Sequence, residues 1–252
     1  MNKKFDGFIK RPQDSKIDDL LSSHFESNQF SPLESLNLFP VYARRQLLKR
    51  FLARVELFKM TLEVPGDIAE LGVFRGFDLM TWANLLEIFS IGDRTKIVYG
   101  FDNWKGFEKI TSKDGNIDES AHRNVGAYSP ELFEESLKQA LDIFDKDRFI
   151  PEKKRVELLK GDISITVPHF IKMNPGARFS LVHFDCDLYE PTLDALEAIW
   201  PRISRGGVVI FDEYALKDWP GETKAVDEFL EDKDVKIKTF PWTNSPAGYL
   251  IK

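Results

Sequence analysis

Four carboxylates stand at the ends of two short apolar segments, residues 180–184 and 207–211. Segments this short, and rich in β-branched and aromatic residues, predict buried strands. In an open parallel sheet, ligands bind outside the carboxyl ends of the strands. Carboxylate oxygens suit a hard divalent cation, so the sequence predicts a Mg²⁺ site at this edge of the sheet. The four acidic residues are Asp185, Asp187, Asp212 and Glu213.

The spacing within each acidic pair sets its geometry. Residues i and i+2 of a strand share a face, so Asp185 and Asp187 would point the same way, roughly 7 Å apart. Cys186 would point to the opposite side, into the core. Two ionised carboxylates this close repel each other unless a cation lies beside them. Asp212 and Glu213 are consecutive, so both can reach one ion only if their strand has already ended.

The turn after the first predicted strand, residues 67–73, is a candidate ligand-binding segment. Its glycines permit a sharp turn and the close approach of a ligand ahead of the next helix. The spacing differs from the G-x-G-x-x-G pattern of dinucleotide sites, so a pyrophosphate is not expected here. Glu70 would instead face a positive group of a smaller ligand. The turn residues proposed to contact this ligand are Gly72, Phe74 and Gly76.

Two further acids follow the next predicted strands. Asp102 ends the strand at residues 96–101, where an acid can hold both hydroxyls of a ribose. Asp162 follows the strand at residues 155–159 and is placed to meet an adenine edge. Each acid alone is equally well explained as a turn residue or a helix cap. Together with Glu70, at three successive strand ends, they favour a nucleoside-containing cofactor.

Glu70-x-Gly72 with Asp102 and Asp162 resembles the S-adenosyl-L-methionine site of class I methyltransferases. More narrowly, three motifs resemble the macrocin O-methyltransferase family, whose members methylate sugar hydroxyls on natural products. The resemblance spans residues 65 to 229 and leaves out the first 40 residues. The motifs are Asp185-Cys-Asp-Leu-Tyr-Glu-Pro-Thr192, Pro201…Gly206-Gly207…Asp212-Glu213-Tyr214 and Trp219-Pro-Gly…Ala-Val-Asp-Glu-Phe229.

The resemblance implies a seven-stranded Rossmann-like sheet, S-adenosyl-L-methionine and Mg²⁺ as cofactors, and homo-oligomers assembled partly through N-terminal helices. It assigns Asp185, Asp212 and Glu213 to the metal, Asp185 also to the cofactor, and Asp187 to the role of general base. The family usually has two aspartates at the second acidic pair, so Glu213 departs from its pattern.

A sugar hydroxyl is a weak nucleophile, and a bound divalent ion lowers the pKa of a coordinated oxygen. Mg²⁺ is a weaker Lewis acid than zinc, so a positioned base should still help. The methyl group is expected to pass in line to the activated oxygen, with positioning supplying much of the acceleration. An alternative function is a metal-dependent nucleotide-sugar glycosyltransferase that uses Asp185-Cys186-Asp187 as a D-x-D motif. Glu70, which would repel a phosphate, and the second acidic pair argue against it.

The loop at residues 103–128 is long enough to be a lid over the site. Aromatic side chains at its ends and on two later segments are candidates for a wall against a sugar ring. His183 precedes the first acidic pair by two residues, and we expect it to be buried and hydrogen-bonded. The aromatic candidates are Trp104, Phe107, Tyr128, Tyr189 and Trp219.

Strands and helices alternate from residue 65 onward, which predicts an α/β fold with a doubly wound, mainly parallel sheet. Two closing strands, at residues 235–240 and 247–251, predict a hairpin and an antiparallel edge. Residues 1–64 form a predicted N-terminal helical extension, and residues 65–252 the methyltransferase domain. The extension ends in an amphipathic helix over residues 41–64. Its basic residues lie off the apolar stripe and are interpreted as a solvated face, or as a contact with an anionic ligand or partner subunit: Arg44, Arg45, Lys49, Arg50 and Arg54.

The composition limits the function classes further. The chain has 252 residues, of which 42% are hydrophobic and 30% charged, as in a globular protein with a sizeable core. A net charge of −6 argues against non-specific nucleic-acid binding. The single cysteine, Cys186, allows no intrachain disulfide and no cysteine-cluster metal site. No signal peptide and no apolar segment of membrane-spanning length is visible, so we expect a cytoplasmic protein without membrane partners.

Overall fold

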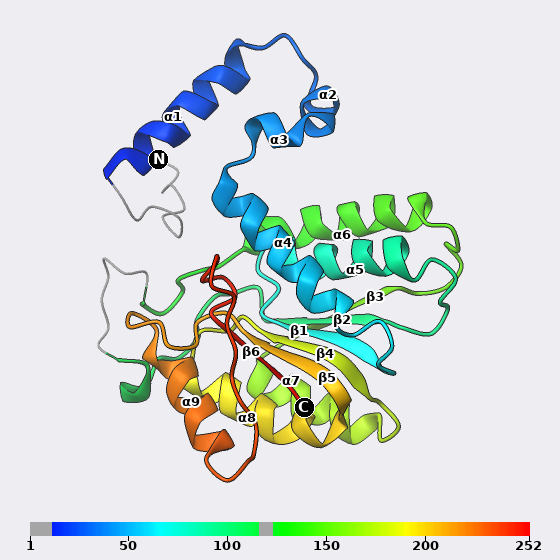
Figure 1. Ribbon diagram of the computed structural model, residues 1–252, viewed down its shortest axis with the longest axis vertical. Helices are drawn as coiled ribbons and strands as arrows, with labels where there is room; N and C mark the ends of the chain where they lie inside the picture. The colour runs from blue at the N-terminus through cyan, green and yellow to red at the C-terminus, as the bar shows by residue number, and fades with distance from the viewer. Residues whose placement is uncertain (1–11, 116–122) are drawn as a thin grey trace. The chain divides into compact units, whose positions relative to one another are not determined.

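The structure, a computed structural model, describes residues 12–115 and 123–252 (Figure 1). The chain divides into two compact units between Leu52 and Ala53. This division falls inside the helix α4 (Arg45–Lys59), because Ala53, Leu57 and Phe58 at its C-terminal end are buried in the core of the second unit. The boundary predicted after residue 64 lies in the segment between α4 and the first strand, and it stays a prediction.

Within the described part of the N-terminal unit, three helices precede α4. They are α1 (Pro12–Ser27), α2 (Pro32–Asn37) and α3 (Phe39–Tyr42). The start of α2 is a capping box, in which the Ser31 side chain accepts from the Glu34 backbone and the Glu34 carboxylate accepts from the Ser31 backbone. An ion pair of 2.8 Å between Arg44 and Asp18 also lies within this unit.

The second unit contains a six-stranded sheet in the order β3-β2-β1-β4-β5-β6. All neighbouring strands are parallel except β5 and β6, which are antiparallel. The doubly wound, mainly parallel sheet with an antiparallel C-terminal strand is therefore confirmed. The strands are β1 (Asp67–Leu71), β2 (Val98–Asp102), β3 (Val156–Lys160), β4 (Phe179–Phe184), β5 (Ile203–Phe211) and β6 (Gly248–Ile251).

The seventh strand implied by the family resemblance does not form among the described residues. Its segment, residues 235–240, contributes one isolated antiparallel bridge between Lys238 and Tyr249. Both backbone hydrogen bonds of this pair are made, at 2.7 and 2.8 Å. Pro241 and Pro246, in the connecting turn, cannot donate ladder hydrogen bonds, so the pairing cannot extend into the turn.

Helices cover both faces of the sheet (Figure 1). The second half of α4, α5 (Phe77–Phe89) and α6 (Glu131–Asp147) pack on one face. The other face carries α7 (Ile163–Met173), α8 (Tyr189–Ile199) and α9 (Pro220–Leu230). Two short 3-10 turns, η1 (Ser112–Asp114) and η3 (Trp200–Arg202), complete the elements. No helix in the described ranges combines the length and apolar character that crossing a membrane requires.

Burial on both faces explains the apolar strands, and their alternation decides which side chain faces which helices. In β5, Val208 and Ile210 pack towards α4 and α5, whereas Val209 and Phe211 pack towards α7 and α8. The same alternation continues past the end of the strand. It therefore determines where the two acids that follow Phe211 point.

Gly72 lets two strand ends approach closely. Its φ of 98° is left-handed, and a Cβ placed on it would lie only 1.9 Å from the backbone oxygen of Asp185. The Asp185 backbone amide in turn donates to the Leu71 oxygen at 2.9 Å. The turn after β1 and the acidic segment after β4 are therefore in direct contact, and only glycine fits between them.

Replacing Gly72 with alanine should destabilise the protein by more than about 2 kcal/mol, because a left-handed backbone and a steric clash both penalise the new methyl group. Urea unfolding followed by circular dichroism measures this. Gly92→Ala is the matched control, since a Cβ there meets nothing within 4 Å. That variant should stay within about 1 kcal/mol of wild type. Equal stability of the two variants would contradict the close approach of the Asp185 backbone.

Candidate active site

Three carboxylates converge beyond the ends of β4 and β5. Asp185, Asp187 and Glu213 each offer an oxygen, and these oxygens all lie within 4.8 Å of one another. The chain turns sharply after β4: Asp187 has a φ of 62°, and the Leu188 amide donates to the Cys186 oxygen at 2.6 Å. This turn, rather than a continued strand, places Asp187 beside Asp185. We call these three side chains the acidic trio.

Asp212 is not part of the acidic trio, and its carboxylate bonds to Arg54 of α4. Its amide continues the ladder by donating to the Phe184 oxygen at 3.1 Å, so the strand alternation persists at this position. Its Oδ1 accepts from Arg54 Nη2 at 2.6 Å. Asp212 and Glu213 therefore diverge, as expected for consecutive strand residues. Asp212 nevertheless lies near enough to contribute to the raised pKa of Asp187.

The buried carboxylates at this edge of the sheet repel one another, and this repulsion favours their protonated forms. Exclusion from water, and then the nearby Asp212, raise the pKa of Asp187 to about 7. Burial, followed by repulsion from Asp187, holds the pKa of Glu213 well above its usual range. Glu213 Oε2 is buried and has no hydrogen-bond partner among the described residues. Oxygen donors and an unsatisfied carboxylate oxygen fit a hard divalent cation at this position.

Glu222 is a fifth acid at this edge, and the sequence pattern does not reveal it. It lies in the first turn of α9, is fully buried, and its Oε1 accepts from the Glu213 backbone amide at 2.9 Å. Its Oε2 has no partner in the described part of the chain. In the sequence, an acid in the first turn of a helix is explained by the helix dipole alone. The only available signal was its position directly after Trp219-Pro220-Gly221.

The turn after β1 is built around Asp102. The backbone amides of Val73 and Phe74 donate to its Oδ2, both at 2.8 Å, and the Trp104 amide donates to its Oδ1 at 2.7 Å. Phe74 takes a left-handed φ of 49°, and Gly76 begins α5 with a φ of 87°. Asp102 thus shapes the candidate cofactor turn, and its contact with a ribose stays a prediction.

Asp162 is the N-cap of α7. Its carboxylate accepts from the Ser164 amide at 2.9 Å, and the side chain is exposed. The helix-cap explanation considered for this residue is therefore confirmed. A contact of the exposed carboxylate with an adenine edge is compatible with the cap and stays a prediction.

Glu70 is fully buried in a polar network with Trp82 and His183. Its Oε2 accepts from Trp82 Nε1 at 2.6 Å and lies 3.0 Å from His183 Nδ1. The expectation that His183 is buried and hydrogen-bonded is confirmed. Burial opposes the charged form of His183, but the nearby Glu70 and Asp212 carboxylates raise its pKa above the usual value. Glu70 Oε1 has no partner among the described residues, which fits an additional donor from a ligand.

Cys186 packs in the core as expected. It is buried among the side chains of the α7 and α8 face, and its Sγ lies 3.4 Å from Thr192 Oγ1. Burial raises the pKa of its thiol well above the usual value. A buried, protonated thiol of this kind has no nucleophilic role.

Three of the aromatic candidates form one cluster around Tyr128. Its ring centroid lies 5.5 Å from that of Phe107 and 6.0 Å from that of Trp219, and it also meets Phe74 at 5.9 Å. The cluster therefore joins the loop, the segment before α9 and the turn after β1. Trp104 is buried in the core, and Tyr189 donates its hydroxyl to Glu228 at 2.7 Å. Residues 116–122 of the predicted lid lie outside the described residues.

Arg54 contradicts the sequence-based interpretation. It was grouped with the basic residues of a solvated helix face, but it is fully buried and bonded to Asp78 and Asp212. The amphipathic pattern does not predict this position, because it contains no information about buried acids from distant segments that pair with the cation. Asp78 in α5 and Asp212 after β5 supply those acids only once the sheet has formed.

Comparisons with known proteins agree with the fold and the motifs. A family model described as macrocin-O-methyltransferase (TylF) matches residues 43–242. Mycinamicin III 3''-O-methyltransferase from Micromonospora griseorubida is 32% identical over 169 residues, covering 67% of this chain and 61% of that protein. An 8-demethyl-8-(2,3-dimethoxy-alpha-L-rhamnosyl)-tetracenomycin-C 4'-O-methyltransferase from Streptomyces olivaceus is 31% identical over 157 residues, covering 61% and 54%. The chain thus spans about six tenths of the length of the curated relatives it matches.

Among solved structures, the calicheamicin methyltransferase CalS11 superposes with a TM-score of 0.89 at 30% identity. The alignment covers 96% of this chain and 93% of CalS11. A second CalS11 structure, of the apo protein described as a TDP-rhamnose 3'-O-methyltransferase, gives a TM-score of 0.80 at 29% identity. The similarity covers the N-terminal helices as well as the sheet domain.

The divalent-ion site at the acidic trio should bind Mn²⁺ more weakly as the pH falls from about 8 to about 6, because protonation removes negative charge from the carboxylates around the ion. The pKa of Asp187, raised to about 7, puts its protonation in this range, and burial raises the pKa of Glu213 as well, so raising the pH increases the negative charge beside the ion and strengthens binding. Isothermal titration calorimetry at several pH values measures the affinity. Asp185→Asn should lose binding, and Asp232→Asn, at an exposed site, should retain it. An affinity independent of pH would rule out an ion held by these groups.

Proposed function

The chain belongs to the macrocin O-methyltransferase family, and from this premise we propose that it methylates a hydroxyl group of a sugar or glycosylated small molecule. The proposed methyl donor is S-adenosyl-L-methionine, and the proposed ion is Mg²⁺. One structural observation carries the proposal: three carboxylate oxygens within 4.8 Å of one another lie next to the turn after β1. Gly72 of that turn touches the Asp185 backbone, so a donor site and an acceptor-activating site would adjoin.

When bound, adenosylmethionine supplies an electrophilic methyl group and the ion lowers the pKa of the acceptor hydroxyl. We propose Asp185, Asp212 and Glu213 as the residues that hold the ion. Asp187 then removes the proton from the acceptor hydroxyl. A pKa of about 7 suits a general base near neutral pH, since the carboxylate is ionised and still basic. The turn at Asp187 fixes its position beside Asp185.

The cofactor residues are proposed around the turn after β1. The unsatisfied Oε1 of Glu70 suits the amino group of the donor's methionine part, and Asp185 is adjacent through Gly72. Gly72, Phe74 and Gly76 shape the turn, and Asp102 fixes it through three backbone amides. The exposed Asp162 carboxylate is the proposed contact of the adenine edge.

The acceptor is proposed to meet the aromatic cluster of Phe107, Tyr128 and Trp219. Burial, and then the charges of Asp187 and Glu213, raise the pKa of the Tyr128 hydroxyl, so it stays protonated and can donate to an acceptor oxygen. Aromatic faces suit the apolar face of a sugar ring and exclude water from it. The rhamnosyl group and the TDP-rhamnose in the names of two similar proteins support this class of substrate.

We also propose that the chain forms homo-oligomers through its N-terminal helices. The support is a set of apolar side chains that are exposed in this unit, because a large exposed apolar surface usually marks a site of interaction with a partner. Two polar residues between them, Ser31 and Glu34, form the capping box of α2. The exposed apolar residues are Leu20, Phe25, Phe30, Leu33, Leu36, Leu38, Phe39 and Val41.

Adenosylhomocysteine should stabilise the protein against heat in the presence of Mn²⁺. A ligand at 100 times its dissociation constant adds about 2.7 kcal/mol to the free energy of unfolding. A nucleoside diphosphate, tested with the same Mn²⁺ concentration, should add far less. The reverse result, stabilisation by the diphosphate alone, would support the D-x-D glycosyltransferase and contradict methyl transfer. Differential scanning fluorimetry measures both.

Asp187→Asn should reduce methyl transfer by about 10²- to 10⁴-fold, because the amide cannot accept the hydroxyl proton. The variant should keep its affinity for adenosylhomocysteine. The release of adenosylhomocysteine in a single-turnover assay with a sugar acceptor measures the rate. Asp234→Asn, at an exposed position away from the acidic trio, is the control and should retain wild-type turnover.

Mn²⁺ titration of Asp187→Asn separates the two roles open to this residue. If Asp187 is a base and not a ligand, the Mn²⁺ affinity of Asp187→Asn stays close to wild type. If Asp187 is a ligand, the affinity falls to the same extent as in Asp185→Asn. Near-normal turnover in Asp187→Asn would remove this residue from the proposed mechanism.

A further inference from the structure

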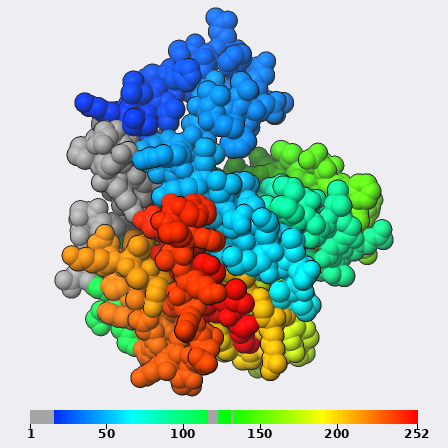
Figure 2. Space-filling view, in the orientation of Figure 1, coloured from blue at the N-terminus to red at the C-terminus, as the bar shows by residue number. Residues whose placement is uncertain are grey.

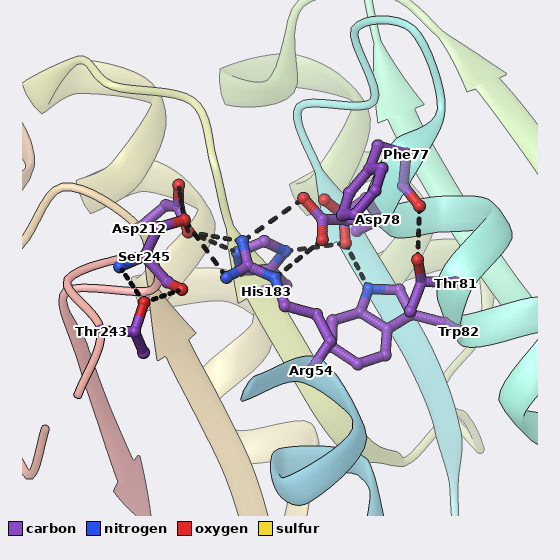
Figure 3. A network of polar contacts seen from close by, with 10 residues as sticks. Arg54, Phe77, Asp78, Thr81, Trp82, His183, Asp212, Thr243 and Ser245 are labelled. Carbon is purple, nitrogen blue, oxygen red and sulfur yellow. Dashed lines mark hydrogen bonds and ion pairs between the residues drawn. The ribbon is translucent and has the colours of Figure 1, made fainter. Parts of the chain in front are cut away.

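Arg54 is a fully buried cation held between two acids from different elements (Figure 3). Its Nε donates to Asp78 Oδ1 at 2.7 Å, and its Nη2 donates to Asp212 Oδ1 at 2.6 Å. Longer contacts of 3.4 Å join Nη2 to Asp78 Oδ2 and Nη1 to the hydroxyl of Ser245. The guanidinium thus bridges α5 and the residue that follows β5.

Stability alone is a poor explanation for this arrangement. Removing three charged groups from water is expensive, and well-packed apolar side chains often replace a buried ion pair without loss of stability. A planar guanidinium does, however, fix the orientation of a carboxylate in a way that a flexible ammonium cannot. The feature of Arg54 that needs explaining is therefore its geometry at Asp212.

Asp212 is restrained from three directions. Besides Arg54, the Ser245 hydroxyl lies 3.4 Å from both carboxylate oxygens, and His183 Nε2 lies 3.6 Å from Oδ1. Ser245 belongs to the C-terminal segment, which Figure 2 shows in red beside the cyan end of α4. These contacts come from α4, β4 and the turn before β6, so they leave the carboxylate little rotational freedom.

We propose that Arg54 is a positioning residue for the divalent-ion site. Its guanidinium fixes the orientation of the Asp212 carboxylate, which directly precedes Glu213 of the acidic trio. Residues that bond to metal ligands commonly set ligand orientation and metal affinity. This inference rests on the proposed function, because it assumes that Asp212 helps to hold the ion.

The fold contains a matched comparison for Arg54. Arg155 is also buried, with 2% of its surface exposed, and its Nε donates to Glu87 at 2.8 Å. Its other nitrogens donate to the backbone oxygens of Lys96 and Asp93. These contacts lie at the amino ends of β2 and β3, the opposite edge of the sheet from the acidic trio. Arg155 therefore reproduces the burial and the ion pair without the site.

The experiment compares Arg54→Lys with Arg155→Lys in the full-length chain. Both changes keep the positive charge and remove the guanidinium fork, so any difference between them reports geometry and not net charge. Near-ultraviolet circular dichroism checks folding, and Mn²⁺ binding is measured by electron paramagnetic resonance and calorimetry. We expect Arg54→Lys to weaken Mn²⁺ binding by about 10- to 100-fold and Arg155→Lys to leave it within about twofold.

Asp78→Asn provides a second test that leaves Asp212 unchanged, and it decides the matter if Arg54→Lys does not fold. It removes the ion pair that anchors the other edge of Arg54, and Glu87→Gln is its control. Weaker Mn²⁺ binding in folded Asp78→Asn, but not in Glu87→Gln, supports the proposal. Wild-type Mn²⁺ affinity in the folded Arg54→Lys or Asp78→Asn protein would overturn it, while the proposed function would stand. Absence of Mn²⁺ binding by the wild-type chain would overturn both.

Discussion

The crowding of carboxylates at one edge of the sheet is the constraint on which the rest of this structure depends. Five carboxyl groups lie close together there, and they cannot all be ionised unless positive charge compensates them. They belong to Asp185, Asp187, Asp212, Glu213 and Glu222. The protein compensates part of this charge itself. Arg54 neutralises Asp212, the Glu213 amide satisfies one oxygen of Glu222, and unsatisfied oxygens remain on Glu213 and Glu222. The remaining imbalance is what makes a bound cation a physical expectation and not only a family trait.

The strand alternation divides the work between the two faces of the sheet. Glu70, His183 and Asp212 share the face covered by α4 and α5, and they form a buried network with Trp82 and Arg54 (Figure 3). Glu213 lies on the opposite side, next to Asp185 and Asp187. Two polar atoms of this network, Glu70 Oε1 and His183 Nε2, have no hydrogen-bond partner among the described residues. The network lies on the face opposite Glu213, so the acidic trio stays available for chemistry.

How much of this could be predicted from the sequence depends on the range of the interaction. The strand ends, the clustering of Asp185 with Glu213, the core position of Cys186 and the buried His183 all follow from local alternation and the order of elements. Arg54 and Glu222 were missed because their partners come from segments far away in the chain. The expectation of a seventh strand was wrong, because the β-rich segment at residues 235–240 pairs with β6 only through the bridge between Lys238 and Tyr249. Asp102 and Asp162 show that an acid at a strand end can shape the backbone and still be a candidate ligand.

The glutamate at position 213 follows from the same geometry. A residue directly after Asp212 must point to the other side of the sheet, and the Glu222 carboxylate fixes its backbone amide there. From that position, the additional methylene group of a glutamate extends its carboxylate towards the turn at Asp187. The oxygens of Glu213 do reach within 4.8 Å of those of Asp185 and Asp187. The departure from the two aspartates implied by the family resemblance is therefore compatible with an ion site, because side-chain length offsets the divergence that consecutive strand residues impose.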